Sequence, residues 1–227
     1  MLNVVTLNAG NYQGRGSEYA NKLSRAVRRN LSLPYRFICF TDDDAGLLPD
    51  IVARPLPHPG LIGLMNKLAL FNPTAFEFGE RILWLDLDTI ISGNIDEIAS
   101  YAGKFAMIED LYFPGRIASG VMAWQAGVEW KSGAPIWESY ADAGYPNIEG
   151  GDQVWIEACR PRVDILQDLY PGQIASYKAS GCQLAPQTRI VCFHGHPRPH
   201  HISAGWVPSL WNGESDPAGN APVRLIH

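Results

Sequence analysis

The sequence contains few cysteines, and no two of them are spaced as a metal-binding or redox pair. Only four occur in 227 residues, at Cys39, Cys159, Cys182 and Cys192, and none forms a Cys-x-x-Cys motif. This spacing argues against a disulfide framework and against a cysteine zinc site. We therefore expect reduced and largely buried thiols.

An excess of positive charge and long apolar runs are also missing. The net charge is -5, so a broad basic face for a nucleic-acid backbone is not expected. Residues Met1 to Leu7 enter a strand pattern without a leader-like segment, and no later run reaches membrane-spanning length. The sequence predicts a cytoplasmic protein that is not an integral membrane protein and has no nucleic-acid partner.

Enough apolar residues are present for one substantial core, because 46% of the chain is hydrophobic and only 18% is charged. The first half alternates strands and helices: strands at 2–7, 36–40, 51–54 and 81–86, a helix at about 17–30, and a helix-period segment with Leu64, Leu68 and Phe71 facing the sheet. The second half is less regular, with strands near 105–108, 121–125 and 189–193 and helices near 134–141 and 152–158. We predict a single α/β domain over 1–227.

The strand pattern at 81–86 ends in two acidic residues. Arg81 to Asp86 is apolar on both faces, as in a central parallel strand, and functional groups in such sheets gather at carboxyl ends. If the strand continues, Asp86 and Asp88 leave the same face with Cα atoms about 6.5 Å apart. Two carboxylates so placed suit Mn2+ or Mg2+, which share their ligand shell with substrate phosphates. The alternative is that both residues merely terminate a strand.

Three other segments carry candidate site residues. The strand before His194-Gly195-His196-Pro197-Arg198 ends in possible metal and phosphate ligands, although a surface tail has the same composition. Asp152 and Gln153 open a helix after two glycines, where Asp152 is also a good N-cap. Lys67 precedes the acidic strand and can meet phosphate or a carboxylate, unless it lies on a solvated helix face.

Taken in order, these motifs resemble the GT-A fold nucleotide-sugar glycosyltransferases, especially the glycogenin-like family eight. The matching segments, in the family's order, are Asn66-Lys67-Leu68-Ala69-Leu70-Phe71, Ile82 to Thr89, Ser119-Gly120-Val121-Met122, Gly151-Asp152-Gln153 and His194 to Pro199. They span most of the chain. The fold that the resemblance implies is a GT-A-like, Rossmann-like, mostly parallel sheet flanked by helices.

The resemblance also implies residue roles. Residues 1–110 approximately would bind the nucleotide sugar, and residues 111–227 would form the acceptor side with a C-terminal metal and phosphate tail. Thr6, Leu7 and Asn8 would lie beside the nucleoside, with Asp42 or Asp43 near its base or ribose. Asp86, Leu87 and Asp88 would hold the metal and diphosphate with Lys67, Gly195 and Arg198, and Asp152 and Gln153 would flank the transferred sugar in the catalytic centre.

Departures from the family pattern affect the third metal ligand and neighbouring contacts. Ala118 stands where the family usually has asparagine, and Arg198 and His200 stand where it has lysine and tryptophan. The family's metal histidine usually lies three residues before the glycine, a place held here by Cys192. We predict His194 as the ligand, with His196 as the alternative.

The predicted activity is metal-dependent transfer from a nucleoside-diphosphate sugar, uridine-based by resemblance, to a saccharide, lipid-linked or protein acceptor. The resemblance implies retention of anomeric configuration. A haloacid dehalogenase-like phosphatase is the main alternative, because its two aspartates have the same spacing as Asp86 and Asp88. Against this alternative, Ile90 stands where that family normally has Thr or Val, and Ile156 stands where it has the second aspartate of its later Gly-Asp-x-x-x-Asp motif. A non-catalytic sugar- or nucleotide-binding protein is the other alternative.

Overall fold

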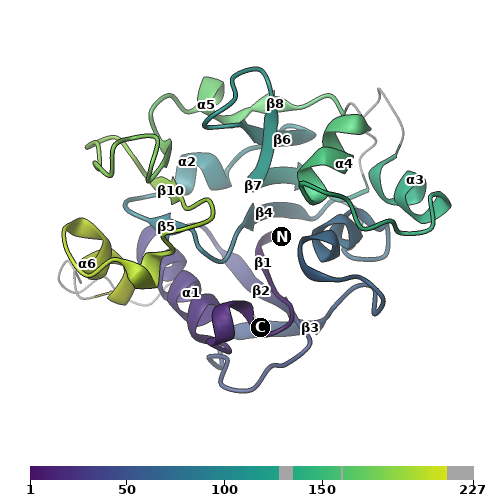
Figure 1. Cartoon of the computed structure of the whole chain (residues 1–227), viewed down its shortest axis with the longest axis horizontal. Helices are drawn as coiled ribbons and strands as arrows, with labels where there is room; N and C mark the ends of the chain where they lie inside the picture. The colour runs from purple at the N-terminus through teal and green to yellow at the C-terminus, as the bar shows by residue number, and fades with distance from the viewer. Residues whose placement is uncertain (128–134, 160, 214–227) are drawn as a thin grey trace.

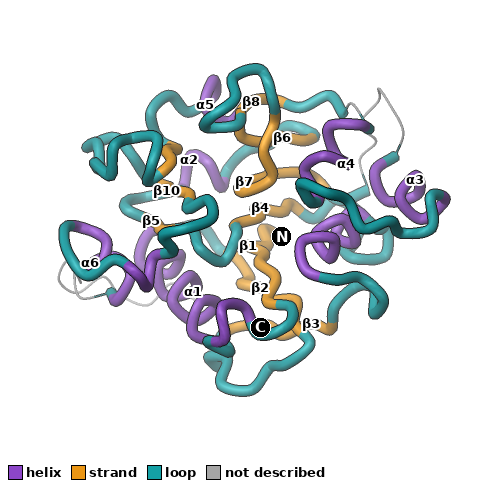
Figure 2. Tube along the Cα trace, in the orientation of Figure 1, coloured by secondary structure: helices purple, strands orange, loops and turns teal. Residues whose placement is uncertain are grey.

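A mostly parallel sheet crosses the middle of the protein. The computed structural model describes residues 1–127, 135–159 and 161–213. In this part of the chain the sheet has seven strands in the order β3-β2-β1-β4-β7-β6-β8 (Figure 1, Figure 2). The strands are β1 (Leu2–Asn8), β2 (Tyr35–Thr41), β3 (Ile51–Pro55), β4 (Arg81–Leu85), β6 (Phe105–Glu109), β7 (Ile117–Gln125) and β8 (Asp164–Ile165). Only β7 among them runs antiparallel to its neighbours, β4 and β6.

Smaller elements flank this sheet. A second sheet in the described chain has the order β5 (Ile90–Ile91), β10 (Ile190–Cys192) and β9 (Ile174–Ser176). The α-helices are α1 (Glu18–Asn30), α2 (Asp96–Ala99), α3 (Ile136–Asp142), α4 (Asp152–Ala158), α5 (Leu166–Leu169) and α6 (Trp206–Asn212). Short 3-10 helices are η1 (Tyr12–Gly14), η2 (Gly63–Phe71) and η3 (Pro199–His201).

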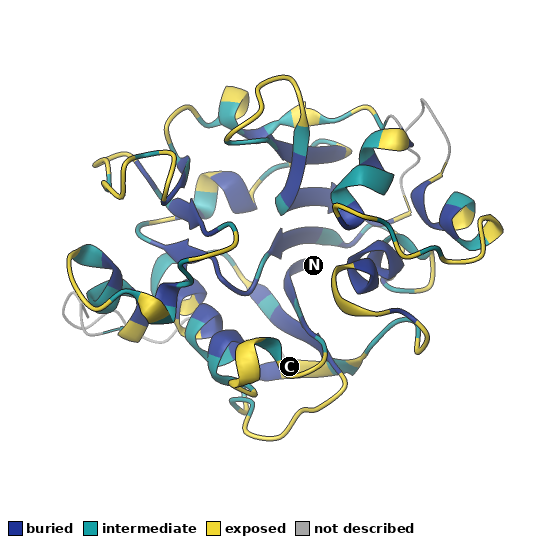
Figure 3. Ribbon diagram, viewed as in Figure 1, coloured by how far each residue is buried: buried dark blue, intermediate teal, exposed yellow. Residues whose placement is uncertain are grey.

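The strands are apolar on both faces because each face has its own cover. Successive residues of a strand point to opposite sides, so Leu83 of β4 joins one core and Trp84 the other. The first core contains Leu23 and Val27 of α1, together with β5, β10 and α6. The second lies against η2, α3 and α4, on the right of the sheet in Figure 3, where the strands are dark blue. This arrangement confirms the predicted α/β class.

Several predicted elements need correction. The segment expected to place Leu64, Leu68 and Phe71 on the sheet is the 3-10 helix η2, with three residues per turn. The tighter winding leaves Leu64 62% exposed while Leu68 is buried. Ala134, the start predicted for the helix near 134–141, lies outside the described residues. The short elements β5, β8, β9, α2, α5 and α6 were not predicted, because two to seven residues carry little periodic signal.

No helix in the described ranges is both long and apolar enough to cross a membrane.

Candidate active site

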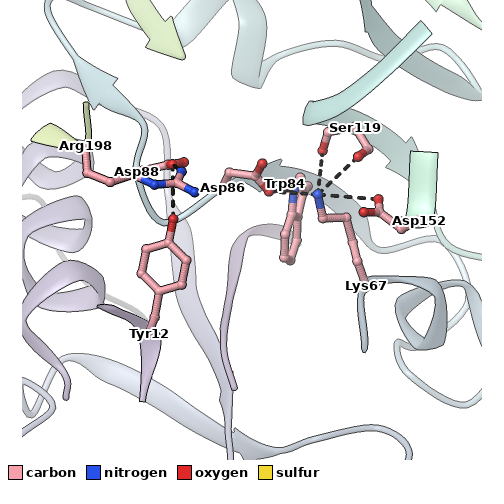
Figure 4. Close-up of polar contacts among 8 residues, drawn as sticks. All are labelled: Tyr12, Lys67, Trp84, Asp86, Asp88, Ser119, Asp152 and Arg198. Atoms are coloured by element: carbon pink, nitrogen blue, oxygen red, sulfur yellow. Dashed lines mark hydrogen bonds and ion pairs between the residues drawn. The ribbon is translucent and has the colours of Figure 1, made fainter. Parts of the chain in front are cut away.

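The two acidic residues after β4 lie in a turn. The strand ends at Leu85, and the Thr89 N–H donates to the Asp86 carbonyl over 3.0 Å. The spacing expected for an extended strand is therefore wrong for Asp86 and Asp88. Figure 4 shows their carboxylates engaged in two different directions, Asp86 toward Lys67 and Asp88 toward Arg198.

Lys67 holds Asp86 and brings Asp152 beside it. Its Nζ lies 2.8 Å from Asp86 Oδ1 and 3.5 Å from Asp152 Oδ2. It also donates to the Ser119 carbonyl over 3.2 Å and to the Ser119 hydroxyl over 3.1 Å. The Trp84 indole N–H donates to Asp86 Oδ1 over 3.0 Å. Lys67 therefore joins the residue after β4, the first part of β7 and the start of α4.

Burial makes this cluster electrostatically tight. The side chains of Lys67 and Asp152 are only 6% and 4% exposed. Burial lowers the pKa of Lys67, but the carboxylates of Asp152 and Asp86 outweigh it and the net shift is upward. Burial raises the pKa of Asp152 against the opposing charge of Lys67. The interpretation of Lys67 as part of a solvated helix face is therefore wrong, because its ammonium is buried among carboxylates and carbonyls.

Asp88 has its own pair of partners. Its side chain is 5% exposed, the Tyr12 hydroxyl donates to Oδ2 over 3.1 Å, and Arg198 Nη1 contacts the same oxygen. The Arg198 guanidinium also lies 5.6 Å from the centre of the Tyr12 ring. Burial raises the pKa of Tyr12, which keeps its hydroxyl protonated and able to donate. Arg198 thus pairs with an acidic residue of the site, and Tyr12 is a site residue that the sequence pattern did not reveal.

His194 lies within electrostatic range of Asp86. Its Nε2 is buried without a hydrogen-bond partner, and its ring lies 5.7 Å from the Tyr112 ring. Burial lowers its pKa, against the charges of Asp86 and Asp110, which favours the neutral imidazole. His196 is exposed. At the family's histidine position, Cys192 is buried and its thiol pKa is raised to about 12, chiefly by burial.

The donor atoms suit a hard divalent cation, but their present positions do not form a completed site. Two carboxylates and a neutral, unpartnered imidazole nitrogen are ligands that Mn2+ accepts. Among the described residues, however, no three His, Cys, Asp or Glu side chains are grouped closely enough to hold a metal. The carboxylates of Asp86 and Asp88 are instead paired with the side chains of Lys67 and Arg198, respectively. Gly195 is exposed and has a φ of 60°, a backbone conformation that favours glycine, so the presence of glycine at this position is explained without a ligand.

The strand-end residues predicted to meet the nucleoside mainly organise a loop. Asn8 donates to the Gly16 carbonyl over 3.0 Å and accepts from the Tyr12 N–H over 3.3 Å. Thr6 is buried, with its hydroxyl unpartnered, and Leu7 is half-buried. Asn8 therefore shapes the loop that carries Tyr12 to Asp88.

The two predicted acidic residues after β2 behave differently from each other. Both oxygens of Asp42 accept from the Gly10 N–H, each at 3.1 Å, which ties the ends of β1 and β2 together. Asp43 accepts from the Ala45 N–H over 2.9 Å within its own turn. Asp42 and Asp43 are thus engaged by backbone, at the same sheet edge as Asp86.

The start of α4 supplies the remaining predicted residues and identifies one more. Gly151, at φ 81°, is the N-cap residue and Asp152 the first helical residue, so the capping interpretation of Asp152 is wrong. Gln153 Nε2 donates to Asp110 Oδ2 over 3.2 Å. Asp110 Oδ1 accepts from the N–H groups of Tyr112 at 2.8 Å and Phe113 at 3.1 Å. Sequence reasoning missed Asp110, although it follows an apolar strand as Asp86 does.

Comparisons with solved structures place this fold among glycosyltransferases. GlyE of Streptococcus pneumoniae TIGR4 superposes with a TM-score of 0.68 at 17% identity, over 93% of this chain and 59% of GlyE. The galactosyltransferase LgtC, in complex with donor and acceptor sugar analogs, gives 0.60 at 12% identity over 93% of this chain and 92% of LgtC. The bifunctional glycosyltransferase WbbM gives 0.58 at 12% identity over 87% and 46%. These matches confirm the predicted GT-A-like fold.

The chain spans about three fifths of the length of GlyE. No family model matches the sequence, and no curated protein matches it either. The resemblance to family eight therefore remains a prediction.

Proposed function

We propose that this protein is a metal-dependent glycosyltransferase that moves a sugar from a nucleoside-diphosphate donor to an acceptor. The observation that carries the proposal is the position of Asp86 and Asp88 directly after β4, at the carboxyl end of a central parallel strand. Ligands of open α/β sheets bind at such ends. The fold is shared with GlyE, LgtC and WbbM, all glycosyltransferases.

The donor would lie along the ends of β1, β2 and β4. Asn8 and Thr41 are paired at the ends of β1 and β2, so the predicted nucleoside contacts, Thr6 to Asn8 and Asp42 or Asp43, belong to one edge. Arg198 offers planar donors that match diphosphate oxygens. We take the nucleoside to be uridine, as the family resemblance implies.

Asp86, Asp88 and His194 would hold Mn2+ or Mg2+. A bound cation of this kind would neutralise the charge that grows on the diphosphate as the bond to the sugar breaks. Lys67 fixes the Asp86 carboxylate over 2.8 Å, and Trp84 fixes the same oxygen, so this ligand is positioned before the donor arrives. Such positioning lowers the reorganisation needed during the reaction.

Asp152 and Gln153 would flank the transferred sugar. Lys67 of η2 orients the Asp152 carboxylate, and Asp110, just after β6, orients the Gln153 amide, so both groups are held by neighbours from outside α4. We propose that transfer retains the anomeric configuration, with the acceptor hydroxyl attacking the face that the diphosphate leaves. The acceptor is a saccharide, a lipid-linked sugar or a protein.

The fold also separates this proposal from the phosphatase alternative. The solved structures that share this fold, GlyE, LgtC and WbbM, are glycosyltransferases. A non-catalytic binding protein stays the second alternative, and it is distinguished by binding of the donor without hydrolysis or transfer.

The test combines a ligand screen with one substitution. Thermal-shift screening of nucleotide sugars with and without Mn2+ should show stabilisation that needs both components. Asp88→Asn keeps the side-chain volume but removes the charge, and it should abolish Mn2+-dependent UDP binding in calorimetry. Asp50→Asn, which changes an acidic residue paired with Arg28 on the surface, is the matched control and should bind as the wild type does. Unchanged binding by Asp88→Asn would remove the metal site from the proposal.

A further inference from the structure

Each of the two carboxylates after β4 already carries a cationic side chain, but the two cations are held very differently. Lys67 contacts Asp86 and Arg198 contacts Asp88 (Figure 4). A divalent cation placed between the carboxylates meets both positive charges. Which of the two can leave decides how a metal enters.

Lys67 is fixed by the fold. Its Nζ has the Asp86 carboxylate, the Ser119 carbonyl, the Ser119 hydroxyl and the Asp152 carboxylate as neighbours between 2.8 and 3.5 Å. If Lys67 moved away, the Asp152 carboxylate, which is only 4% exposed, would be left buried without a counter-charge. Lys67 therefore stays in place when ligands bind.

Arg198 is held much less completely. Its side chain is 20% exposed, its Nε is buried without a hydrogen-bond partner, and it belongs to the loop between β10 and η3. A guanidinium has five N–H donors, and a diphosphate offers several anionic acceptors where Asp88 offers one carboxylate. Arg198 can therefore exchange Asp88 for a phosphate, provided that the incoming metal replaces it as the counter-charge of the buried Asp88 carboxylate.

We propose that Arg198 is an internal counter-cation that blocks the metal position at Asp88 in the free protein and leaves it for the donor diphosphate. This inference rests on the proposed function and adds its regulation. The metal then enters with the nucleotide, and the free protein binds divalent cations weakly. His194, whose buried Nε2 has no hydrogen-bond partner, would then supply a ligand to the incoming metal.

The experiment measures Mn2+ binding to the full chain without any substrate. Mn2+ is titrated into wild type, Arg198→Gln, Arg198→Lys and Arg28→Gln, and free Mn2+ is read from its electron paramagnetic resonance signal. Arg28 pairs with Asp50 on the surface, so Arg28→Gln is the control for loss of one positive charge. Thermal melting verifies that each variant is folded.

Arg198→Gln should bind Mn2+ about tenfold more tightly than wild type, a factor within the usual range for coupled sites. Arg198→Lys keeps the charge and should bind nearly as weakly as wild type, as should Arg28→Gln. Equal Mn2+ affinity of wild type and Arg198→Gln overturns the proposal. So does an Arg198→Lys variant that binds as tightly as Arg198→Gln, because the block would then not be the charge.

A parallel titration with UDP separates this failure from failure of the proposed function. If wild type and Arg198→Gln bind no Mn2+ beyond the amount that UDP itself holds, the metal site is absent and both proposals fall. If wild type binds Mn2+ with UDP, and Arg198→Gln shows no gain in the free state, only the role of Arg198 is lost.

Discussion

Replacing Lys67 by methionine tests whether its ammonium is a structural tie between the acidic groups. Methionine retains an unbranched side chain of similar length and removes the charge. Asp86 is 35% exposed and can be solvated after the change, whereas Asp152 is 4% exposed and cannot. The cost therefore arises mainly from a buried Asp152 carboxylate without its counter-charge.

The magnitude follows from two independent bounds. Breaking a buried ion pair by removing one partner costs about 3–5 kcal/mol. The carboxyl can also escape by taking up a proton, which costs about 1.4 kcal/mol for each unit by which pH exceeds its ordinary pKa near 3.9, or about 4 kcal/mol at pH 7. We expect Lys67→Met to lower the free energy of unfolding by about 3–4 kcal/mol at pH 7.

Because a buried Asp152 can take up a proton, the loss of stability in Lys67→Met should depend on pH. Burial already raises the pKa of Asp152, and loss of Lys67 removes the main charge that opposes this shift. A raised carboxyl pKa in the folded state means that the folded state binds the proton more tightly, so stability falls as pH rises from about 4 through the raised value. The deficit of Lys67→Met should accordingly be smaller at pH 5 than at pH 7.

Urea unfolding followed by tryptophan fluorescence measures both quantities. Lys104→Met changes an exposed lysine and should stay within about 0.5 kcal/mol of wild type. The double variant Lys67→Met with Asp152→Asn lacks the stranded charge and should be more stable than Lys67→Met alone. A deficit below about 1 kcal/mol at pH 7, or one that is equal at pH 5 and pH 7, would refute the reasoning.

Two further substitutions probe the frame around the site. Burial opposes a downward shift of the Asp96 pKa, but hydrogen bonds from the Ser32 hydroxyl and its N–H (2.7 Å) outweigh it. Asp96→Ala should therefore lower the free energy of unfolding by about 1 kcal/mol at pH 7, a value discounted for the partial exposure of Asp96. As pH falls below about 4 and Asp96 becomes protonated, the urea midpoints of variant and wild type should converge. Gly151→Ala should cost about 1–3 kcal/mol in the same assay, because φ is 81° and the added Cβ would lie 2.9 Å from Leu64 Cδ1. Gly205→Ala, with φ 75° and no atom within 4 Å, should cost less; an equal loss would show that the contact with Leu64 is unimportant.

Elements with a repeated pattern were predictable from sequence. The alternation and apolar runs of β1, β2 and β4 and the helical period of α1 gave their positions within one or two residues. In η2, Leu68 is buried and Phe71 packs against the core as predicted, whereas Leu64 is exposed. The 3-10 winding that turns Leu64 outward occurs where η2 packs against α3 and α4. The intrinsic conformational preferences of residues 63–71 carry no information about that packing.

The sequence also indicated the candidate acidic site, since Asp86 and Asp88 follow a strand that is apolar on both faces. The order of its motifs along the chain resembles that of glycosyltransferases. The partners of Asp86 and Asp88 were decided by tertiary structure alone. Tyr12 and Arg198 reach Asp88 from 76 and 110 residues away along the chain. Lys67 reaches Ser119 across 52 residues. A pattern along the chain records which residues share a face of one element, but electrostatic pairing depends on distances between elements, and these exist only once the sheet has formed.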